Sequence, residues 1–272
     1  MVHISNTYLR ASISNMGAEP RSLYNIESAT EILWQQEGSF WGYTAPILFP
    51  IFGECCNNQY LCCDTPYTIP RHGFARILPF ELISSTPTTA TFSLSQSPET
   101  LAQYPFDFTL LAEYSLEGKK FTTTFTVINT GHEDLPFQLG SHPAFRFAIE
   151  DLAKCYILFD EKEPQLPPLS EDFRRLNVSD IPKDGKNSYS ISNPNSGNVT
   201  LVTPEYKLKL TLAGISRIVI WRPTPDTPFV SIEPLVGGGD RKDIVFDIYE
   251  RNGAVILKKG QEFSISSSIT CE

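Results

Sequence analysis

Two of the four histidines lie in segments that favour a chemical role. His72 sits between two guanidinium groups in Arg71-His-Gly-Phe-Ala-Arg76, and His142 sits between a flexible and a rigid residue in Gly140-Ser-His-Pro-Ala-Phe145. An imidazole titrates near neutral pH, so it can exchange a proton with a substrate or hydrogen-bond to one. A histidine taken alone is more often a hydrogen-bonded structural residue, and this is the interpretation for the other two, His3 and His132.

A third candidate is a carboxylate. Glu233 follows the apolar residues 229–232 and precedes Pro234, so it lies at the end of a predicted strand. Glutamate is rarely buried without a partner. Glu233 therefore either faces solvent at a sheet edge or is held on a rigid strand end as a general base. Trp221 closes another predicted strand, where its ring either stacks on a sugar or packs in the core.

Two further motifs indicate structure more than chemistry. Residues 237–240 (Gly-Gly-Gly-Asp) lack the Lys-Ser/Thr ending and the helix of a phosphate-binding loop, so a plain loop is predicted. Four cysteines form two adjacent pairs, Cys55-Cys56 and Cys62-Cys63. They could form a metal or redox site, but they lack the usual zinc spacing, which favours reduced thiols. No metal is expected.

The elements that must position these residues are predicted from apolar and polar residues that alternate with a period of two. Apolar and polar residues alternate over 106–116, a Glu117-Gly118 turn follows, and the alternation resumes over 121–127, which predicts a long antiparallel hairpin with one buried face. The series predicts an all-β fold in one domain over residues 1–272, with a single helical turn at 98–103 and a loop over 165–186. The other predicted strands are 77–83, 90–95, 135–139, 187–191, 199–202, 206–212, 217–221, 229–232, 254–257 and 263–269.

Composition narrows the possible partners. The chain has 272 residues, 41% of them hydrophobic, and a formal net charge of −9. Such a surface repels phosphate backbones, so neither nucleic acid nor an anionic membrane is an expected partner. No segment has the roughly 18 apolar residues of a membrane helix, and the N-terminus lacks the pattern of a signal peptide. A cytoplasmic location is therefore expected.

Taken in order, several segments resemble the aldose 1-epimerase (galactose mutarotase) family, and its shorter bacterial-type branch most. The resemblance implies a β-supersandwich with large antiparallel sheets and a concave sugar-binding groove, and neither a metal nor an organic cofactor. The segments that carry it are Pro46-Ile-Leu-Phe-Pro-Ile-Phe-Gly53, Arg71-His-Gly-Phe-Ala-Arg76, Val127-Ile-Asn-Thr-Gly131, Gly140-Ser-His-Pro-Ala-Phe145, Ile220-Trp221 and Ile232-Glu-Pro234.

The resemblance also implies roles for single residues. Opening a cyclic hemiacetal requires one group to take the proton of the C1 hydroxyl and another to protonate the ring oxygen. The family pattern places Glu233 as the base, His142 as the acid and His72 as a hydrogen-bonding partner near the ring oxygen. The remaining residues that would bind the sugar or support the groove are Arg71, Arg76, Trp221 and Asn129.

Two departures from the family pattern bear on the substrate. Many relatives have an arginine just after the Phe-Pro-x-x-Gly segment, where this sequence has Glu54. Either Arg71 or Arg76 then replaces it, or the substrate differs. The usual pocket aspartate has no clear counterpart; Asp160 and Asp226 are the candidates.

The sequence leaves four functions open, the fourth and least specific of which is a purely structural interaction module. The first is a cofactor-free aldose 1-epimerase acting on a hexose, and the second is a hexose-6-phosphate 1-epimerase, which would need cations at one rim of the groove. The third is a non-catalytic sugar-binding or sensor protein, because a fold alone does not guarantee activity. In the first three cases the expected partner is a small-molecule sugar, and the expected state is a monomer or a weak homodimer.

Overall fold

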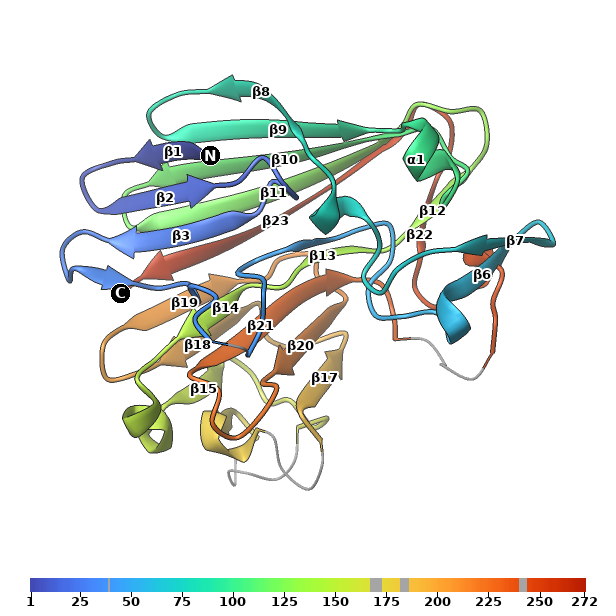
Figure 1. Cartoon of the computed structure of the whole chain (residues 1–272). Helices are drawn as coiled ribbons and strands as arrows, with labels where there is room; N and C mark the ends of the chain where they lie inside the picture. Colours follow the sequence, from blue (N-terminus) through green and yellow to red (C-terminus); the bar gives the residue numbers. More distant parts are fainter. Residues whose placement is uncertain (39, 167–172, 182–185, 240–243) are drawn as a thin grey trace.

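The structure, a computed structural model, describes residues 1–38, 40–166, 173–181, 186–239 and 244–272. Strands make up nearly all of the regular structure in these ranges, and they form two large and three small antiparallel sheets (Figure 1). The predicted all-β class is therefore confirmed. Among the residues described, no helix is both long and apolar enough to cross a membrane.

A nine-stranded sheet forms one layer. Its central hairpin follows the predicted alternation, because Phe108, Leu110 and Ala112 are buried while their neighbours in sequence are more exposed. The pairing runs from Phe108 opposite Asn129 to Glu117 opposite Lys120. In sheet order the strands are β16 (Arg175–Asn177), β15 (Tyr156–Phe159), β18 (Asn198–Val202), β19 (Lys207–Thr211), β23 (Glu262–Cys271), β11 (Lys120–Asn129), β10 (Phe108–Glu117), β9 (Thr89–Ser95) and β8 (Glu81–Ser85).

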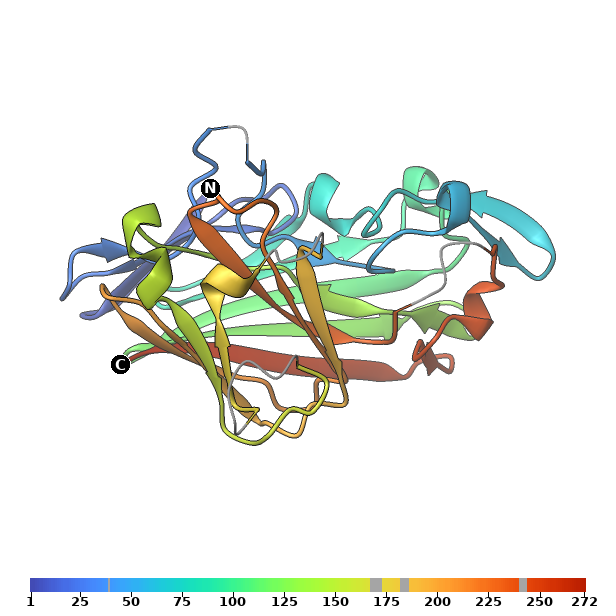
Figure 2. The same cartoon turned by 90° about the horizontal axis from the view of Figure 1, so that it is seen from below.

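A six-stranded sheet lies against one face of this layer, as the two views show together (Figures 1 and 2). Its strands are β17 (Ser188–Ser192), β20 (Arg217–Trp221), β21 (Phe229–Val236), β13 (Leu139–Ser141) and β5 (Ile47–Leu48), with β14 (Ala144–Arg146) also paired to β21. Every residue of β21 is buried, because its two faces contact the core and the candidate site described below.

Smaller elements complete the described part of the chain. The N-terminal sheet consists of β1 (Val2–Ser5), β2 (Leu9–Ile13), β3 (Pro20–Asn25) and β4 (Thr30–Glu31), and two strand pairs join β12 (Leu135–Phe137) to β22 (Val255–Leu257) and β6 (Gln59–Cys62) to β7 (Thr65–Thr68). The predicted helical turn is α1 (Pro98–Leu101). The 3₁₀ helices are η1 (Cys56–Asn58), η2 (Ala75–Ile77), η3 (Ile149–Lys154), η4 (Val178–Asp180) and η5 (Ile248–Glu250).

Two sequence predictions need correction. The strand predicted over 77–83 is shorter, because η2 extends to Ile77 and β8 begins only at Glu81; Pro79 lies between them and cannot donate to a ladder. The predicted loop over 165–186 contains β16 and η4. Residues 167–172 and 182–185 of that loop lie outside the described residues.

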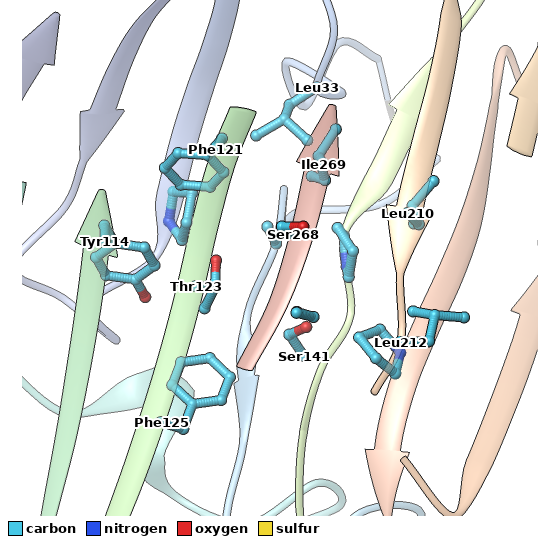
Figure 3. A pocket seen from close by; sticks show the side chains of 15 residues that line it. Leu33, Tyr114, Phe121, Thr123, Phe125, Ser141, Leu210, Leu212, Ser268 and Ile269 are labelled. Atoms are coloured by element: carbon cyan, nitrogen blue, oxygen red, sulfur yellow. The ribbon is translucent and has the colours of Figure 1, made fainter. Parts of the chain in front are cut away.

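The core between the two large sheets contains a small cavity of about 30 Å³. Tyr114, Phe121 and Phe125 of the nine-stranded sheet line it, and Ser141 of β13 lies among them (Figure 3). This volume holds roughly one or two water molecules. A sugar needs more room, and a larger cavity lies on the opposite face of the six-stranded sheet.

Candidate active site

The pairing of β21 brings His142 beside Glu233. Residues 229–231 of β21 pair with β14, whereas Leu235 and Val236 pair with β13. The connection from β13 to β14 passes through His142 and therefore crosses β21 at Glu233. The strand does not end at Glu233, as the sequence suggested, but continues to Val236. Its Pro234, which has no N–H, lies where the partner strand changes.

Gly140 allows this close crossing. A Cβ atom at Gly140 would lie 2.7 Å from the Pro234 carbonyl oxygen and 2.4 Å from a methyl group of Leu235. Only glycine fits between β13 and β21 at this distance.

His142 and Glu233 form a buried pair. His142 Nε2 lies 3.2 Å from Glu233 Oε1, and both side chains are less than 10% exposed. Burial raises the pKa of Glu233 well above its usual range, which Arg71 offsets only in part. Burial also lowers the pKa of His142 to about 3, and Arg71 and Arg76 act in the same direction. The pair therefore carries one proton across neutral pH.

The other ring nitrogen of His142 is also engaged. His142 Nδ1 lies 2.8 Å from Ser231 Oγ, and this hydroxyl donates to the Pro143 carbonyl oxygen at 2.7 Å. Ser231 and Glu233 are two residues apart on β21, so they point to the same face of the strand. One rigid strand thus holds both edges of the imidazole.

His72 lies in a tight left-handed turn against the loop that follows β5. His72 and Gly73 have φ values of 66° and 69°, and a Cβ atom at Gly73 would lie 2.2 Å from the Phe49 carbonyl oxygen. The His72 amide donates to the Gly53 oxygen, and the Gly53 amide donates to His72 Nδ1 at 3.1 Å. The backbone therefore fixes the ring, whose centroid lies 5.9 Å from that of His142.

Burial keeps His72 neutral. It lowers the pKa of His72 to about 2, and the charges of His142, Arg76 and Arg71 act in the same direction. Arg71 Nε also points at His72 Nε2, at 3.2 Å. A neutral imidazole has only one nitrogen with a lone pair. It cannot accept from Gly53 and Arg71 together, and the arginine side chain is the partner that can move away.

Arg71 and Arg76 both line the cavity. Arg76 Nη2 donates to the Arg71 carbonyl oxygen at 2.7 Å, and the Arg76 guanidinium stacks over Tyr43 at 4.8 Å. Burial lowers the pKa of Arg76. Its Nε is buried without a hydrogen-bond partner among the described residues. Such a group gains from a ligand that accepts a hydrogen bond.

These side chains share one cavity of about 410 Å³. This volume is within the range of small-ligand sites. The residues predicted from the sequence that line it are His72, His142, Glu233, Arg71, Arg76 and Trp221. The residues not predicted as site residues are Trp41, Phe52, Gly53, Asn187, Ser188, Val219 and Leu235.

Aromatic rings form one wall of the cavity. Trp41 lies against the His142 ring with centroids 4.7 Å apart, and Trp221 meets the same ring edge-on at 5.2 Å. The two indoles also contact each other at 5.5 Å. Trp41 was not predicted, although its segment, Phe40-Trp-Gly-Tyr43, concentrates aromatic residues within a loop. Such rings present an apolar face to the C–H groups of a sugar.

Three candidates lie away from the cavity. Asn129 was expected to line or support the groove; it does not line the cavity, and its side chain bonds to Gly131, Glu133 and Leu257 and holds the turn after β11. Asp160 accepts from Asn198, Asp226 accepts from Thr224, and neither lines the cavity. Glu54 is half-buried and does not line the cavity, although its neighbour Gly53 does.

The cysteines do not gather into a metal centre. None of the six cysteines forms a disulfide bond. Within the ranges that the structure describes, no group of three or more His, Cys, Asp or Glu residues could hold a metal ion. Cys55 is buried, and Arg251 donates to its sulfur at 3.0 Å, while Arg251 also donates to Gln138 and to the Phe52 carbonyl oxygen. This arginine therefore supports the chain segment beside the cavity.

The fold is that of a galactose mutarotase-like β-supersandwich, and comparisons with known proteins agree. The aldose 1-epimerase family model matches residues 1–270. The chain therefore belongs to the aldose 1-epimerase family. A galactose mutarotase-like protein from Lactobacillus casei is 27% identical, with a TM-score of 0.88 and full coverage of both chains. A galactose mutarotase related enzyme from Lactobacillus acidophilus is 28% identical, with a TM-score of 0.90, covering 100% of this chain and 97% of the other.

Curated relatives agree with this placement. The plasmid-encoded protein LacX of Lactococcus lactis subsp. lactis is 28% identical over 263 residues, which cover 87% of each chain. The "Putative glucose-6-phosphate 1-epimerase" of Escherichia coli K12 is 31% identical over 167 residues, which cover 58% of this chain and 51% of the relative. Of these two printed names, only that of the Escherichia coli relative mentions a sugar, and it describes that relative.

Proposed function

We propose that the protein is an aldose 1-epimerase that interconverts the α and β anomers of a hexose without a cofactor. One observation carries the proposal: Glu233 and His142 lie 3.2 Å apart in a cavity of sugar size. The directions of their pKa shifts are consistent with one proton on this pair. Anomer exchange needs one proton acceptor and one proton donor at the same carbon, and a pair with a single proton provides both.

The reaction follows from this proton count. In the reactive form Glu233 is ionised and His142 carries a proton on Nε2. Glu233 takes the proton of the C1 hydroxyl while His142 protonates the ring oxygen, so the bond between C1 and that oxygen breaks and C1 becomes an aldehyde. The C1–C2 bond then rotates, and the reverse transfers close the ring on the other face of C1.

No proton has to come from solvent. After ring opening the proton lies on Glu233 and His142 is neutral, which is the other arrangement of the same pair. Burial favours this uncharged arrangement in the free protein. Positioned acids and bases of this kind contribute about 10²–10⁴-fold each to a rate.

His72 would act as a neutral donor. Because the Gly53 amide occupies Nδ1, the ring proton belongs on Nε2. When Arg71 turns toward a ligand, this N–H is free to bond to a sugar oxygen near the ring. Its low pKa means that it would stabilise developing charge without transferring a proton itself.

Polarimetry of freshly dissolved α-glucose, α-galactose and other aldoses tests the proposal. The protein is expected to speed mutarotation of at least one sugar well beyond buffer, and Glu233→Gln is expected to abolish most of this rate. Glu113→Gln, which makes the same change at an exposed position of β10, is the control. Failure to accelerate any aldose would refute the proposal; sugar binding without acceleration would instead indicate a sensor protein.

A phosphorylated hexose is the second candidate substrate, because Arg71 and Arg76 line the cavity and the only carboxylate among its described lining residues is Glu233. Guanidinium groups bind phosphate well. Under this alternative kcat/KM is higher for glucose 6-phosphate than for glucose, and Arg71→Ala raises KM for the phosphate ester only. The exposed Arg10→Ala is the control. Equal loss for both sugars would contradict it.

A further inference from the structure

The ring of His142 is held by one strand at both nitrogens. Nδ1 lies 2.8 Å from Ser231 Oγ, and Nε2 lies 3.2 Å from Glu233 Oε1. Ser231 is fully buried, so no bulk water competes for these contacts. The position of the protons on this ring can therefore be worked out from the neighbouring groups.

The serine hydroxyl has only one hydrogen. Ser231 Oγ lies 2.7 Å from the Pro143 carbonyl oxygen, and a carbonyl oxygen only accepts, so the hydrogen must lie between these two oxygens. The amide of Ile232 also donates to this carbonyl, at 3.3 Å, but it does not remove the need for a hydrogen between two oxygens this close. Ser231 Oγ can then only accept from His142, so Nδ1 carries a proton.

We infer that Ser231 is a positioning residue that keeps His142 Nδ1 protonated and leaves Nε2, beside Glu233, as the nitrogen that exchanges a proton. The catalytic consequence rests on the proposed epimerase function, whereas the protonation of the ring does not. With the other tautomer, Nε2 would already hold a proton in the neutral ring, and the proton of Glu233 would have no acceptor.

Ser231 favours the reactive form of the pair. The hydrogen bond from Nδ1 is stronger when the imidazole is charged than when it is neutral. The charged ring is the form that protonates the sugar. A hydrogen bond to a charged group is worth enough that its loss should lower kcat by about 10- to 100-fold. KM should change little, because Ser231 does not line the cavity.

The ring nitrogens of His142 can be observed directly by ¹⁵N NMR of histidine-labelled protein, with the signals assigned by the loss that accompanies His142→Asn. A nitrogen with a proton and one with a lone pair have well separated shifts. For the neutral ring the expected spectrum shows a protonated Nδ1 in the wild-type protein and a shift toward the other tautomer in Ser231→Ala. A neutral ring with a lone pair on Nδ1 in the wild-type protein would overturn the inference.

Kinetics provide the second readout. Ser231→Ala should lose about 10- to 100-fold in kcat at nearly constant KM, and Ser231→Thr, which keeps the hydroxyl, should recover most of it. Ser141→Ala is the matched control, since this serine adjoins His142 in sequence but lies at the inner cavity (Figure 3). Equal kcat values for Ser231→Ala and Ser141→Ala would refute the role.

These tests separate the two proposals. The wild-type spectrum needs no variant, so it decides the tautomer even if Ser231→Ala does not fold. The spectrum can also be recorded whether or not the protein has enzymatic activity. A protonated Nδ1 in a protein that epimerises no sugar would support the role of Ser231 in holding the ring while the proposed function fails; an unprotonated Nδ1 in an active enzyme would do the reverse.

Discussion

Glu233 and His142 should behave as one catalytic unit, and a double-mutant cycle measures this. In Glu233→Gln the new amide donates to His142 Nε2, and because Nδ1 is already protonated the ring stays neutral and cannot act as the acid. In His142→Asn the carboxyl group of Glu233 remains buried and protonated, so it cannot act as the base. Each single change therefore disables both groups.

The expected magnitudes follow from this argument. Each single variant should lose about 10²–10⁴-fold in kcat. If the two groups were independent, the double variant would lose the product, about 10⁴–10⁸-fold. We predict that the kcat of the double variant lies within about tenfold of the kcat of the less active single variant. This corresponds to a coupling free energy of at least about 1.4 kcal/mol, and more for larger single effects.

Magnetisation transfer between the α and β anomer signals of the sugar provides the assay, since it measures exchange at equilibrium. Thermal unfolding of each variant must first show that the fold is retained, and Glu113→Gln controls for the loss of a carboxylate elsewhere. Losses that multiply in the double variant would show that Glu233 and His142 act separately, and the shared-proton argument would then be wrong.

Three other predictions follow from the geometry. His72 is neutral in the folded protein down to about pH 2 but protonates near pH 6.5 when unfolded, so the free energy of unfolding should fall as pH drops below 6.5, by at most about 1.4 kcal/mol per pH unit. Denaturant titrations at several pH values should show that the free energy of unfolding of His72→Gln depends less steeply on pH. The same pH dependence in this variant and the wild-type protein would contradict the prediction. Gly140→Ala should lower the free energy of unfolding by about 1–3 kcal/mol or more and reduce kcat, because β13 must move from β21; wild-type values for both would contradict it. Asn129→Ala should destabilise by about 1–3 kcal/mol with kcat unchanged in the molecules that remain folded, and a selective loss of kcat would place Asn129 in the site after all.

The sequence predicts the parts of the fold that depend on local pattern. The alternation around Phe108 and Phe121 marks β10 and β11, because a half-buried strand needs one apolar face. The N-terminal strands and the hairpin of β6 and β7 were not predicted. β7 has no buried residue, so it lacks the apolar alternation by which strands are recognised.

The candidate site likewise contains residues that the sequence predicts and residues that it does not. His72, His142 and Glu233 stand out by residue type and by their glycine and proline neighbours. Their approach depends on the change of pairing along β21, which no local pattern encodes. Ser231 was overlooked because a serine within an apolar strand has no distinctive signal, and its role appears only once His142 is placed beside it.

Asn129 was predicted from the resemblance alone. It lies in a segment shared with the family and was therefore expected to line or support the groove. The sequence Asn129-Thr-Gly131 is also a turn signal, since an asparagine side chain can accept the backbone N–H two residues later. The structure has this hydrogen bond, at 2.9 Å. The local chemistry, given more weight, would have predicted a turn.

The most direct test of the central claim is a crystal structure of the wild-type protein with the sugar that it epimerises fastest. The account predicts that C1 lies between the two groups, with its hydroxyl oxygen within about 2.6–3.2 Å of Glu233 Oε1 and the ring oxygen at a similar distance from His142 Nε2. A sugar bound in this cavity with C1 turned away from both side chains, or bound only elsewhere on the protein, would contradict it.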